Sequence, residues 1–292
     1  MSVFVQQSGS ECEFSNSDSW VILSPIEQSI KRKIEAVGTP LKDWDINIYR
    51  GVLTGYNEAF IISTEKRNEI LANCQTEDER TRTAELIRPI LRGRDIKRYG
   101  YNWANLWLIN THNGIRGKLE RVHIEDYPAI KAHLDQYWDR ISKRADKGDT
   151  PYNLRNCAYL EDFSKPKILW KRVGSILRFC YNDNEALGLD STCFALGNNI
   201  EFVCCVLNTP MGHYLLQDAP KTGTGDLLIS VQAVEPIKLP SVTYEINIEF
   251  KRLLEMMIAN CSDDIENEIS QKIFNLYGLS HEEQKYIEEN FT

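Results

Sequence analysis

The sequence predicts an α+β fold in which a mixed sheet is followed by a small C-terminal helical segment. Short strand-like runs and amphipathic helical stretches follow one another without the regular alternation of a βαβ protein. Residues 241–292, by contrast, contain no strand signal and indicate two or three helices. We therefore divide the chain into a flexible lead or linker stump at 1–19, a mixed domain at 20–240 and a helical segment at 241–292.

The first elements are marked by caps and short apolar runs. Order is expected to begin near Trp20, and Ser24 with Glu27 predicts a capping box whose helix continues to Gly38. Strand-like runs follow at 46–49 and 59–62, with a loop containing two glycines between them.

The middle of the chain alternates between helical and extended patterns. Thr76 and Glu79 begin a second helix, which Pro89 ends, and a basic loop then leads to a strand at 105–110. Apolar residues at helical spacing predict one long amphipathic helix over 124–144.

The second half of the mixed domain has more strands. Runs at 167–171, 176–181 and 192–196 predict strands, and 198–208 predicts a buried helix. The run at 228–240 is strand-like and ends in prolines. Among the C-terminal helices, 250–259 is amphipathic, and the last begins at a capping box formed by Ser280 and Glu283.

Composition indicates a globular protein of the cytoplasm. The 292 residues are 42% hydrophobic, but no stretch approaches the roughly 18 apolar residues of a membrane span, and the N-terminus lacks a signal-peptide layout. We expect no membrane association. The eight cysteines include no C-x-x-C pair, so we expect reduced thiols rather than disulfides or a zinc site.

Charge is distributed unevenly along the chain. The net charge is −8, yet residues 80–180 hold 21 bases against 11 acids, whereas residues 241–292 hold 11 acids and 4 bases. A basic middle between acidic ends is consistent with binding of an anionic polymer, and ordinary solvated helix faces are the alternative. If DNA binds the basic segment, the acidic segment is expected to face away from it and to be dispensable for binding.

The catalytic motifs of DNA modification are missing from the sequence. There is no N-P-P-[YFW] motif for a flipped adenine and no glycine-rich turn for S-adenosylmethionine; Asn208-Thr209-Pro210 is the nearest fragment. Glu283-Gln284-Lys285 is a weak match to a nuclease motif, and the five histidines lack metal-ligand spacing. We predict no catalytic residues, no metal and no cofactor in this chain.

Several strings in order resemble a known family. They are RGVLTGYNEAFII at 50–62, LIRPILRGRDIKRY at 86–99, SKPKILW at 164–170, CCVLNTPMGHYLL at 204–216, VEPIKLP at 234–240 and IFNLYGLSHEEQKYIEE at 273–289. Together they resemble the TaqI-like C-terminal specificity domain of adenine-specific DNA methyltransferases and fused restriction–modification enzymes, from Trp20 to the C-terminus.

The resemblance implies a DNA target recognition domain at 20–240 that is not catalytic by itself. Its partners would be double-stranded DNA and a methyltransferase domain or subunit, which would hold S-adenosylmethionine and modify the flipped adenine. Two alternatives stay open. One is a scaffold or regulatory module of a methyltransferase complex with incidental DNA affinity, and the other is an independent nuclease.

The predicted DNA contacts are basic clusters and polar loops. Arg88, Arg92, Arg94, Lys97 and Arg98 form one cluster, opposed only by Asp95, whose pairing with an arginine, most readily Arg94, is the structural alternative. Lys165, Lys167, Lys171, Arg172 and Arg178 form the second, where strand alternation places Lys167, Leu169 and Lys171 on one DNA-facing side. An ordinary solvated strand is the alternative. The loop candidates are Tyr56, Asn57, Tyr152, Asn153, Lys221, Thr222 and Thr224. For Tyr56 and Asn57, a polar turn is the alternative.

Overall fold

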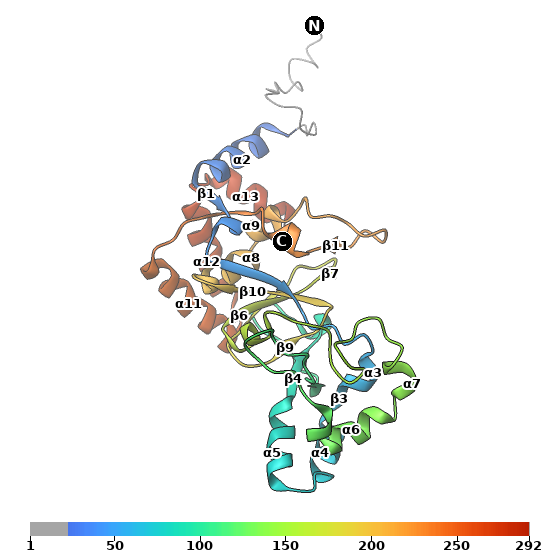
Figure 1. The fold of residues 1–292 in the computed structure, drawn as a ribbon. Helices are drawn as coiled ribbons and strands as arrows, with labels where there is room; N and C mark the ends of the chain where they lie inside the picture. The colour runs from blue at the N-terminus through green and yellow to red at the C-terminus, as the bar shows by residue number, and fades with distance from the viewer. Residues whose placement is uncertain (1–22, 292) are drawn as a thin grey trace.

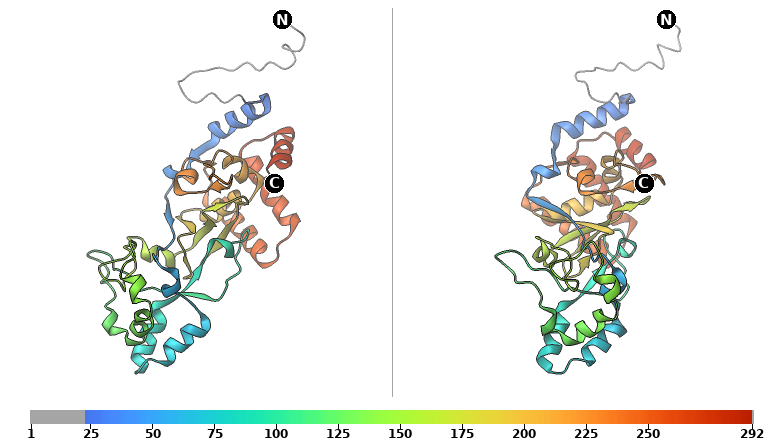
Figure 2. Two further views of the ribbon diagram at one scale, coloured as in Figure 1. Left: turned by 90° about the vertical axis from the view of Figure 1, so that its right-hand side faces the viewer. Right: turned by 45° about the vertical axis from the view of Figure 1, so that its right-hand side comes forward.

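The computed structural model describes residues 23–291. Figure 1 shows two lobes stacked along one axis with a sheet between them, and Figure 2 shows the same elongated outline from two further sides. The lead predicted at 1–19 and the predicted start of order at Trp20 lie outside the described residues.

The sheet between the lobes is antiparallel. Its order is β2 (Ile46–Arg50), β10 (Thr192–Gly197), β6 (Lys167–Lys171) and β8 (Phe179–Asn182). Successive side chains of a strand point to opposite faces. Along β10, Cys193 and Ala195 join one hydrophobic core, whereas Phe194 and Leu196 join the other. The sheet is therefore internal, with a core on each face.

Helices cover one face of this sheet. α8 (Ile200–Leu207) lies against β6, β8 and β10 and is buried along nearly its whole length, including Cys204 and Cys205, as its apolar run predicted. Among the helices of this lobe, those that contact α8 are α9 (Pro210–Leu215), α11 (Tyr244–Ala259) and α12 (Asp263–Leu276). The lobe also contains α2 (Pro25–Val37) and α13 (His281–Asn290), which packs against α9. The helices predicted within 241–292 are confirmed, and their apolar faces share a core with the sheet.

Smaller elements complete this lobe. β1 (Gly38–Pro40) pairs with β12 (Lys238–Pro240), which follows the short α10 (Val231–Val234). β7 (Val173–Gly174) pairs with β11 (Leu227–Leu228) and extends the connection between β6 and β8 outward.

The second lobe is built on its own sheet, ordered β3 (Ile61–Ser63), β5 (Leu106–Ile109), β4 (Ile87–Leu91) and β9 (Leu187–Gly188), with β4 and β9 parallel. Helices α3 (Asn57–Phe60), α4 (Thr64–Ala72), α5 (Glu77–Leu86), α6 (Pro128–Asp135) and α7 (Trp138–Ile141) belong to this lobe (Figure 1). Short 3-10 turns are η1 (Leu41–Asp43), η2 (Gly93–Asp95), η3 (Ile124–Asp126) and η4 (Leu160–Ser164). The fold class is α+β, as predicted.

Both predicted capping boxes are present. The Ser24 backbone N–H donates to Glu27 Oε2 at 2.7 Å, and the Glu27 N–H donates to Ser24 Oγ at 3.4 Å. Ser280 and Glu283 repeat this exchange at 2.6 and 3.4 Å at the start of α13. Each box satisfies backbone donors that have no partner inside the helix, which fixes where the helix begins.

Other element predictions were wrong. The long helix expected over 124–144 is broken into η3, α6 and α7, because Pro128 lacks the N–H and the space that a continuous helix would need there. The basic loop expected after α5 begins instead with β4, which contains Pro89. Ala59 and Phe60 are helical rather than extended, and the run at 228–240 contains α10. No helix within the described residues is long and apolar enough to cross a membrane.

Candidate nucleic-acid interface

A basic cleft lies where η2 meets the connection between β6 and β8. It has a volume of about 220 Å³ and is lined by Gly93, Arg94, Ile96, Lys171, Gly174, Ser175, Ile176 and Arg178. We call this set of residues the basic cleft. It brings Arg94, from the first predicted basic cluster, together with Lys171 and Arg178 from the second. The two clusters are distant in the sequence and meet only through the fold.

Backbone contacts around Gly93 hold the two sides of the cleft together. The Gly93 N–H donates to Ser191 Oγ at 3.1 Å, and the Arg172 N–H donates to the Ser191 carbonyl at 2.9 Å. A Cβ atom on Gly93 would lie 2.8 Å from Cγ of Lys171 and 3.0 Å from the Ser191 carbonyl oxygen. Only glycine therefore allows η2 to approach the end of β6 so closely.

The cations of the cleft have no acidic partner. Arg94, Lys171 and Arg178 form no ion pair with any acid in the described part of the chain. Arg94 and Lys171 are exposed, and Arg178 is half-buried. Like charges gathered without counter-ions create a positive potential that attracts anions. The arrangement is suited to binding phosphate groups, and arginine can also bind base edges through paired donors.

The loop of the β11 hairpin lies beside the cleft. β11 pairs with β7, which places Leu227 opposite the cleft residue Gly174. Lys221 bridges to Leu227 and is exposed, and the Thr222 hydroxyl contacts Thr224 Oγ1 at 2.9 Å. The predicted candidate Lys221 thus adds a positive charge to this hairpin, and Thr222 adds an uncharged hydroxyl group. The cleft residues Ser175 and Ile176 were missed by the sequence analysis, because they are uncharged and lie between Arg172 and Arg178 of the second cluster.

Several predicted contacts are engaged within the protein. Arg92 forms a bidentate pair with Asp95, at 3.0 Å from Nε to Oδ2 and 2.8 Å from Nη2 to Oδ1. The expectation that Arg94 would be the partner of Asp95 was wrong. Arg88 pairs with Glu185 at 3.2 Å, and Arg98 pairs with Glu266 of α12. These three arginines are engaged by acids of the protein itself, whereas Lys97 and Arg172 have no acidic partner in residues 23–291.

The prediction that Lys167 and Leu169 lie on an exposed face of β6 was wrong. Both are fully buried, because the second lobe covers the face of the sheet that the sequence pattern left open. Lys167 Nζ donates to Asn182 Oδ1 at 2.9 Å and to the Asn184 carbonyl at 2.6 Å. Burial lowers the pKa of Lys167 to about 8. Of the three residues expected on this face, only Lys171 is exposed.

The two predicted recognition loops meet around one buried arginine. Arg144 donates to the carbonyl oxygens of Thr54, Asp146, Pro151 and Asn153 and lies over the Phe60 ring at 4.4 Å. Burial lowers the pKa of Arg144 to about 10. Through these bonds one side chain fixes both loops.

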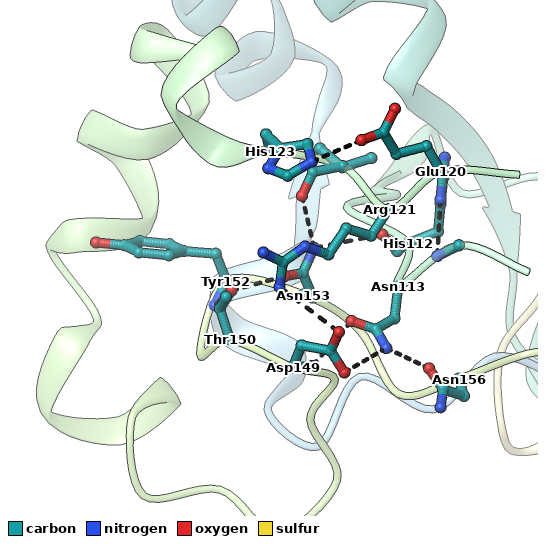
Figure 3. Close-up of polar contacts among 12 residues, drawn as sticks. His112, Asn113, Glu120, Arg121, His123, Asp149, Thr150, Tyr152, Asn153 and Asn156 are labelled. Carbon is teal, nitrogen blue, oxygen red and sulfur yellow. Dashed lines mark hydrogen bonds and ion pairs between the residues drawn. The ribbon is translucent and has the colours of Figure 1, made fainter. Parts of the chain in front are cut away.

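The loop candidates differ in solvent exposure and in whether their polar groups already have partners. Asn57 is exposed and Tyr56 is half-buried, with its ring centroid 6.2 Å from that of Tyr137. Tyr152 donates to Asp135 at 2.5 Å. Asn153 is 1% exposed, and its amide donates to the carbonyl oxygens of His112 and Val122 (Figure 3). A base-reading role for Asn153 is therefore inconsistent with its burial.

A polar network that the sequence analysis missed lies next to Asn153. Asn113 donates to Asp149 Oδ1 at 3.0 Å and to Asn156, and accepts from the Asp149 N–H at 2.8 Å (Figure 3). Arg121 lies 3.5 Å from the same carboxylate. The signal available in the sequence was the turn Asn113-Gly114, with a second glycine at 117 and an arginine between them. No group of three or more potential metal ligands occurs among residues 23–291.

The fold resembles a segment of restriction–modification enzymes. One similar solved structure is the type IIL restriction-modification enzyme MmeI in complex with DNA, with a TM-score of 0.61 and 10% identity over 87% of this chain and 36% of that chain. Another is the type IIG restriction endonuclease BpuSI, with a TM-score of 0.52 and 10% identity over 91% of this chain and 32% of that chain.

At 10% identity these likenesses show the fold alone. This chain spans about a third of the length of either enzyme. No protein-family model matches the sequence, and no curated protein matches it. The comparisons bear out the predicted resemblance as far as a fold like that of restriction–modification enzymes, and the TaqI-like specificity domain stays a prediction.

Proposed function

We propose that this chain is a DNA sequence-recognition module of a restriction–modification enzyme and is not catalytic by itself. The observation that carries the proposal is the basic cleft, where Arg94, Lys171 and Arg178 converge from separate segments without acidic partners. Most other arginines and lysines of residues 80–180 are paired or buried, so these three are available to a ligand. The fold similarity to restriction–modification enzymes, one of them in complex with DNA, supports DNA as that ligand.

The proposal assigns chemistry to another domain or subunit. The sequence lacks both the motif that holds a flipped adenine and the turn that holds S-adenosylmethionine. An associated methyltransferase domain or subunit would bind that cofactor and modify the base. In the two enzymes, about two thirds of the chain lies outside the matched segment, which is long enough for a further domain.

The test is DNA binding by a variant of the cleft. In Arg94→Gln/Lys171→Gln, duplex affinity is expected to fall, and the slope of log affinity against log salt to decrease by about 2, one unit for each lost phosphate contact. The matched control is Lys31→Gln/Arg32→Gln, which removes the same charge from exposed, unpaired positions on α2. Equal losses in the two double variants would mean that the duplex responds only to net charge, and the proposed surface would then be wrong.

A second function is favoured by α11. Its exposed apolar side chains Tyr244, Ile248 and Ile258 are 72%, 44% and 48% accessible and share one side of the helix with Glu255. Such a stripe favours docking of a partner. The alternative is therefore a scaffold that binds a methyltransferase subunit through α11. Co-elution with that subunit that is lost in Tyr244→Ser/Ile248→Ser, together with no duplex retention at low salt, would favour it.

A further inference from the structure

A second cavity lies in the region of the network shown in Figure 3. It has a volume of about 630 Å³ and is lined by Asn113, Gly114, Ile115, Arg116, Gly117, Leu119, Arg121, Asp149, Asn156, Cys157 and Ala158. It is formed by the hairpin at 113–119 on one side and by residues 156–158 on the other. Ile115, Leu119 and Ala158 supply apolar walls, and the remaining lining is largely polar. The cavity therefore combines a few apolar side chains with several convergent polar groups, and the polar groups determine which ligand it can bind.

The polar wall is held rigidly before any ligand arrives. The Asn113 amide uses both N–H groups and its oxygen on Asp149 and Asn156. Arg121 Nη1 lies 3.5 Å from Asp149 Oδ2, which places the guanidinium at the cavity edge. A preorganised wall of this kind loses little entropy when a ligand binds.

The hairpin presents Arg116 to the cavity. Ile115 and Leu119 exchange backbone hydrogen bonds at 2.8 and 2.9 Å, and Arg116 lies in the turn between them. Gly114 and Gly117 flank it at φ +74° and +73°, values that residues with a Cβ rarely adopt. The turn is therefore specified by its glycines, and it keeps Arg116 exposed.

The unpartnered hydrogen-bond donors in the lining indicate the chemistry of the ligand. The Arg116 guanidinium and the Asn156 amide nitrogen have no partner within residues 23–291, whereas the oxygen of Asn156 is occupied by Asn113. The neighbouring side chains are already engaged, Lys118 by Glu161 and His123 by Glu120. Two arginines face one aspartate in the lining. Free donors and an excess of positive charge match an anion that offers several acceptor oxygens.

We propose that this cavity binds the phosphate of a nucleotide, with Arg116 as the ion-pairing cation and Asn156 as a neutral donor. This inference rests on the proposed function when the phosphate belongs to a DNA backbone; a free nucleotide is the other source of the same group. This cavity and the basic cleft share no lining residue.

The test compares two substitutions in one hairpin. Arg116→Gln removes the cation that lines the cavity, and Lys118→Gln removes an equal charge that does not line it. Raising the salt from about 50 to 200 mM should weaken duplex binding by both proteins. The loss of affinity should be about threefold larger for wild type than for Arg116→Gln, because the variant lacks one phosphate contact. Lys118→Gln should follow wild type. Arg116→Lys, which keeps the charge, should retain most of the salt dependence. Melting curves of each variant check that it folds.

The second arm uses 2′-deoxyadenosine 5′-monophosphate, followed by phosphorus NMR and calorimetry. If wild type binds the mononucleotide and Arg116→Gln does not, while the salt dependence of duplex binding is the same for both, the site binds a free nucleotide. The inference is overturned if Arg116→Gln and Lys118→Gln change binding equally. It is also overturned if Arg116→Gln changes neither duplex binding nor mononucleotide binding. If Arg94→Gln/Lys171→Gln weakens duplex binding and Arg116→Gln does not, and the nucleotide does not bind, only the inference fails. If Arg116→Gln alone weakens duplex binding, the proposed cleft fails and this site stands.

Discussion

Arg92 forms a bidentate ion pair with Asp95 and thereby leaves Arg94, two residues further along, without an acidic partner. Hydrogen bonds to Asp95 raise the pKa of Arg92, so its charge is fixed. The pair also closes η2, because the Arg92 N–H donates to Asp95 Oδ2 at 2.8 Å and the Asp95 N–H to the Arg92 carbonyl at 2.9 Å. One arginine braces the turn, and the next presents its charge to solvent.

The first prediction separates these two roles. Arg92→Ala should lower the free energy of unfolding by about 2 kcal/mol, because it leaves the carboxylate of Asp95, 5% exposed, without its partner. Arg94→Ala should change it by no more than about 0.5 kcal/mol but weaken duplex binding. Urea unfolding and a binding titration on the same preparations measure both. The opposite pattern would mean that Arg94 is the structural residue.

Local signals in the sequence predicted one part of the site and missed another. Charge density identified Arg94, Lys171 and Arg178, but their convergence depends on η2 reaching the end of β6, which is a non-local contact. The alternation along β6 correctly placed Lys167 and Leu169 on one face. It could not indicate that a second lobe covers that face, so Lys167 was expected in solvent and is buried.

A second prediction concerns the acidic C-terminal helices, which the sequence suggested were dispensable. Phe250, Ile269 and Phe274 are fully or almost fully buried in the core that Trp170 and α8 share. A chain ending at residue 240 would expose that core and free Arg98 from Glu266. We expect it to lose its cooperative thermal transition, as seen by circular dichroism, and to bind a hydrophobic dye. A cooperative transition close to that of the full chain would show that these helices are an independent unit.

The fold was most predictable where a few adjacent residues determine it. The capping boxes at Ser24 and Ser280 fix helix starts by hydrogen bonds within four residues, and the apolar run of α8 required burial on all sides. β4 was missed because Pro89 disfavours a strand unless its neighbours supply the pairing. Here β4 is flanked by β5, the next strand along the chain, and by β9, which lies about a hundred residues further on.

The third prediction concerns acid stability at the contact between α2 and α13. Burial alone would raise the pKa of Glu283, but hydrogen bonds from Lys33 Nζ at 2.6 Å, Ser29 at 2.7 Å and the Ser280 N–H lower it to about 2. This carboxylate therefore stabilises the fold above its ordinary pKa of 4.5 and loses that effect as pH falls through about 2.

Glu283→Gln should accordingly be less stable than wild type by about 2 kcal/mol at neutral pH, and the difference should narrow between pH 4.5 and 2. Urea unfolding at several pH values measures it. Glu282→Gln, at the exposed neighbouring position, is the control and should track wild type throughout. A gap that is independent of pH would assign the effect to packing instead of charge.

The fourth prediction concerns the lysine buried beneath the sheet. Lys167 is fully buried, and burial lowers its pKa to about 8 from an ordinary value of 10.5. Between these two values the unfolded chain binds more protons than the folded one, so this group makes the fold more stable as pH rises from about 8 to 10.5. Below that window the cost of burying the ammonium is fully present and constant.

Lys167→Met removes this titration while keeping an unbranched chain of similar length. The difference in unfolding free energy, wild type minus variant, should therefore be flat below about pH 8 and rise by about 2 to 3 kcal/mol towards pH 10.5. Taking the difference cancels the titration of buried tyrosines such as Tyr99 and Tyr277, which both proteins share and whose raised pKa values act in the opposite direction. Urea unfolding at half-unit pH steps gives the curve. Parallel stability profiles from pH 7 to 10.5 would mean that Lys167 keeps an ordinary pKa, and that water or a local opening reaches it despite its burial.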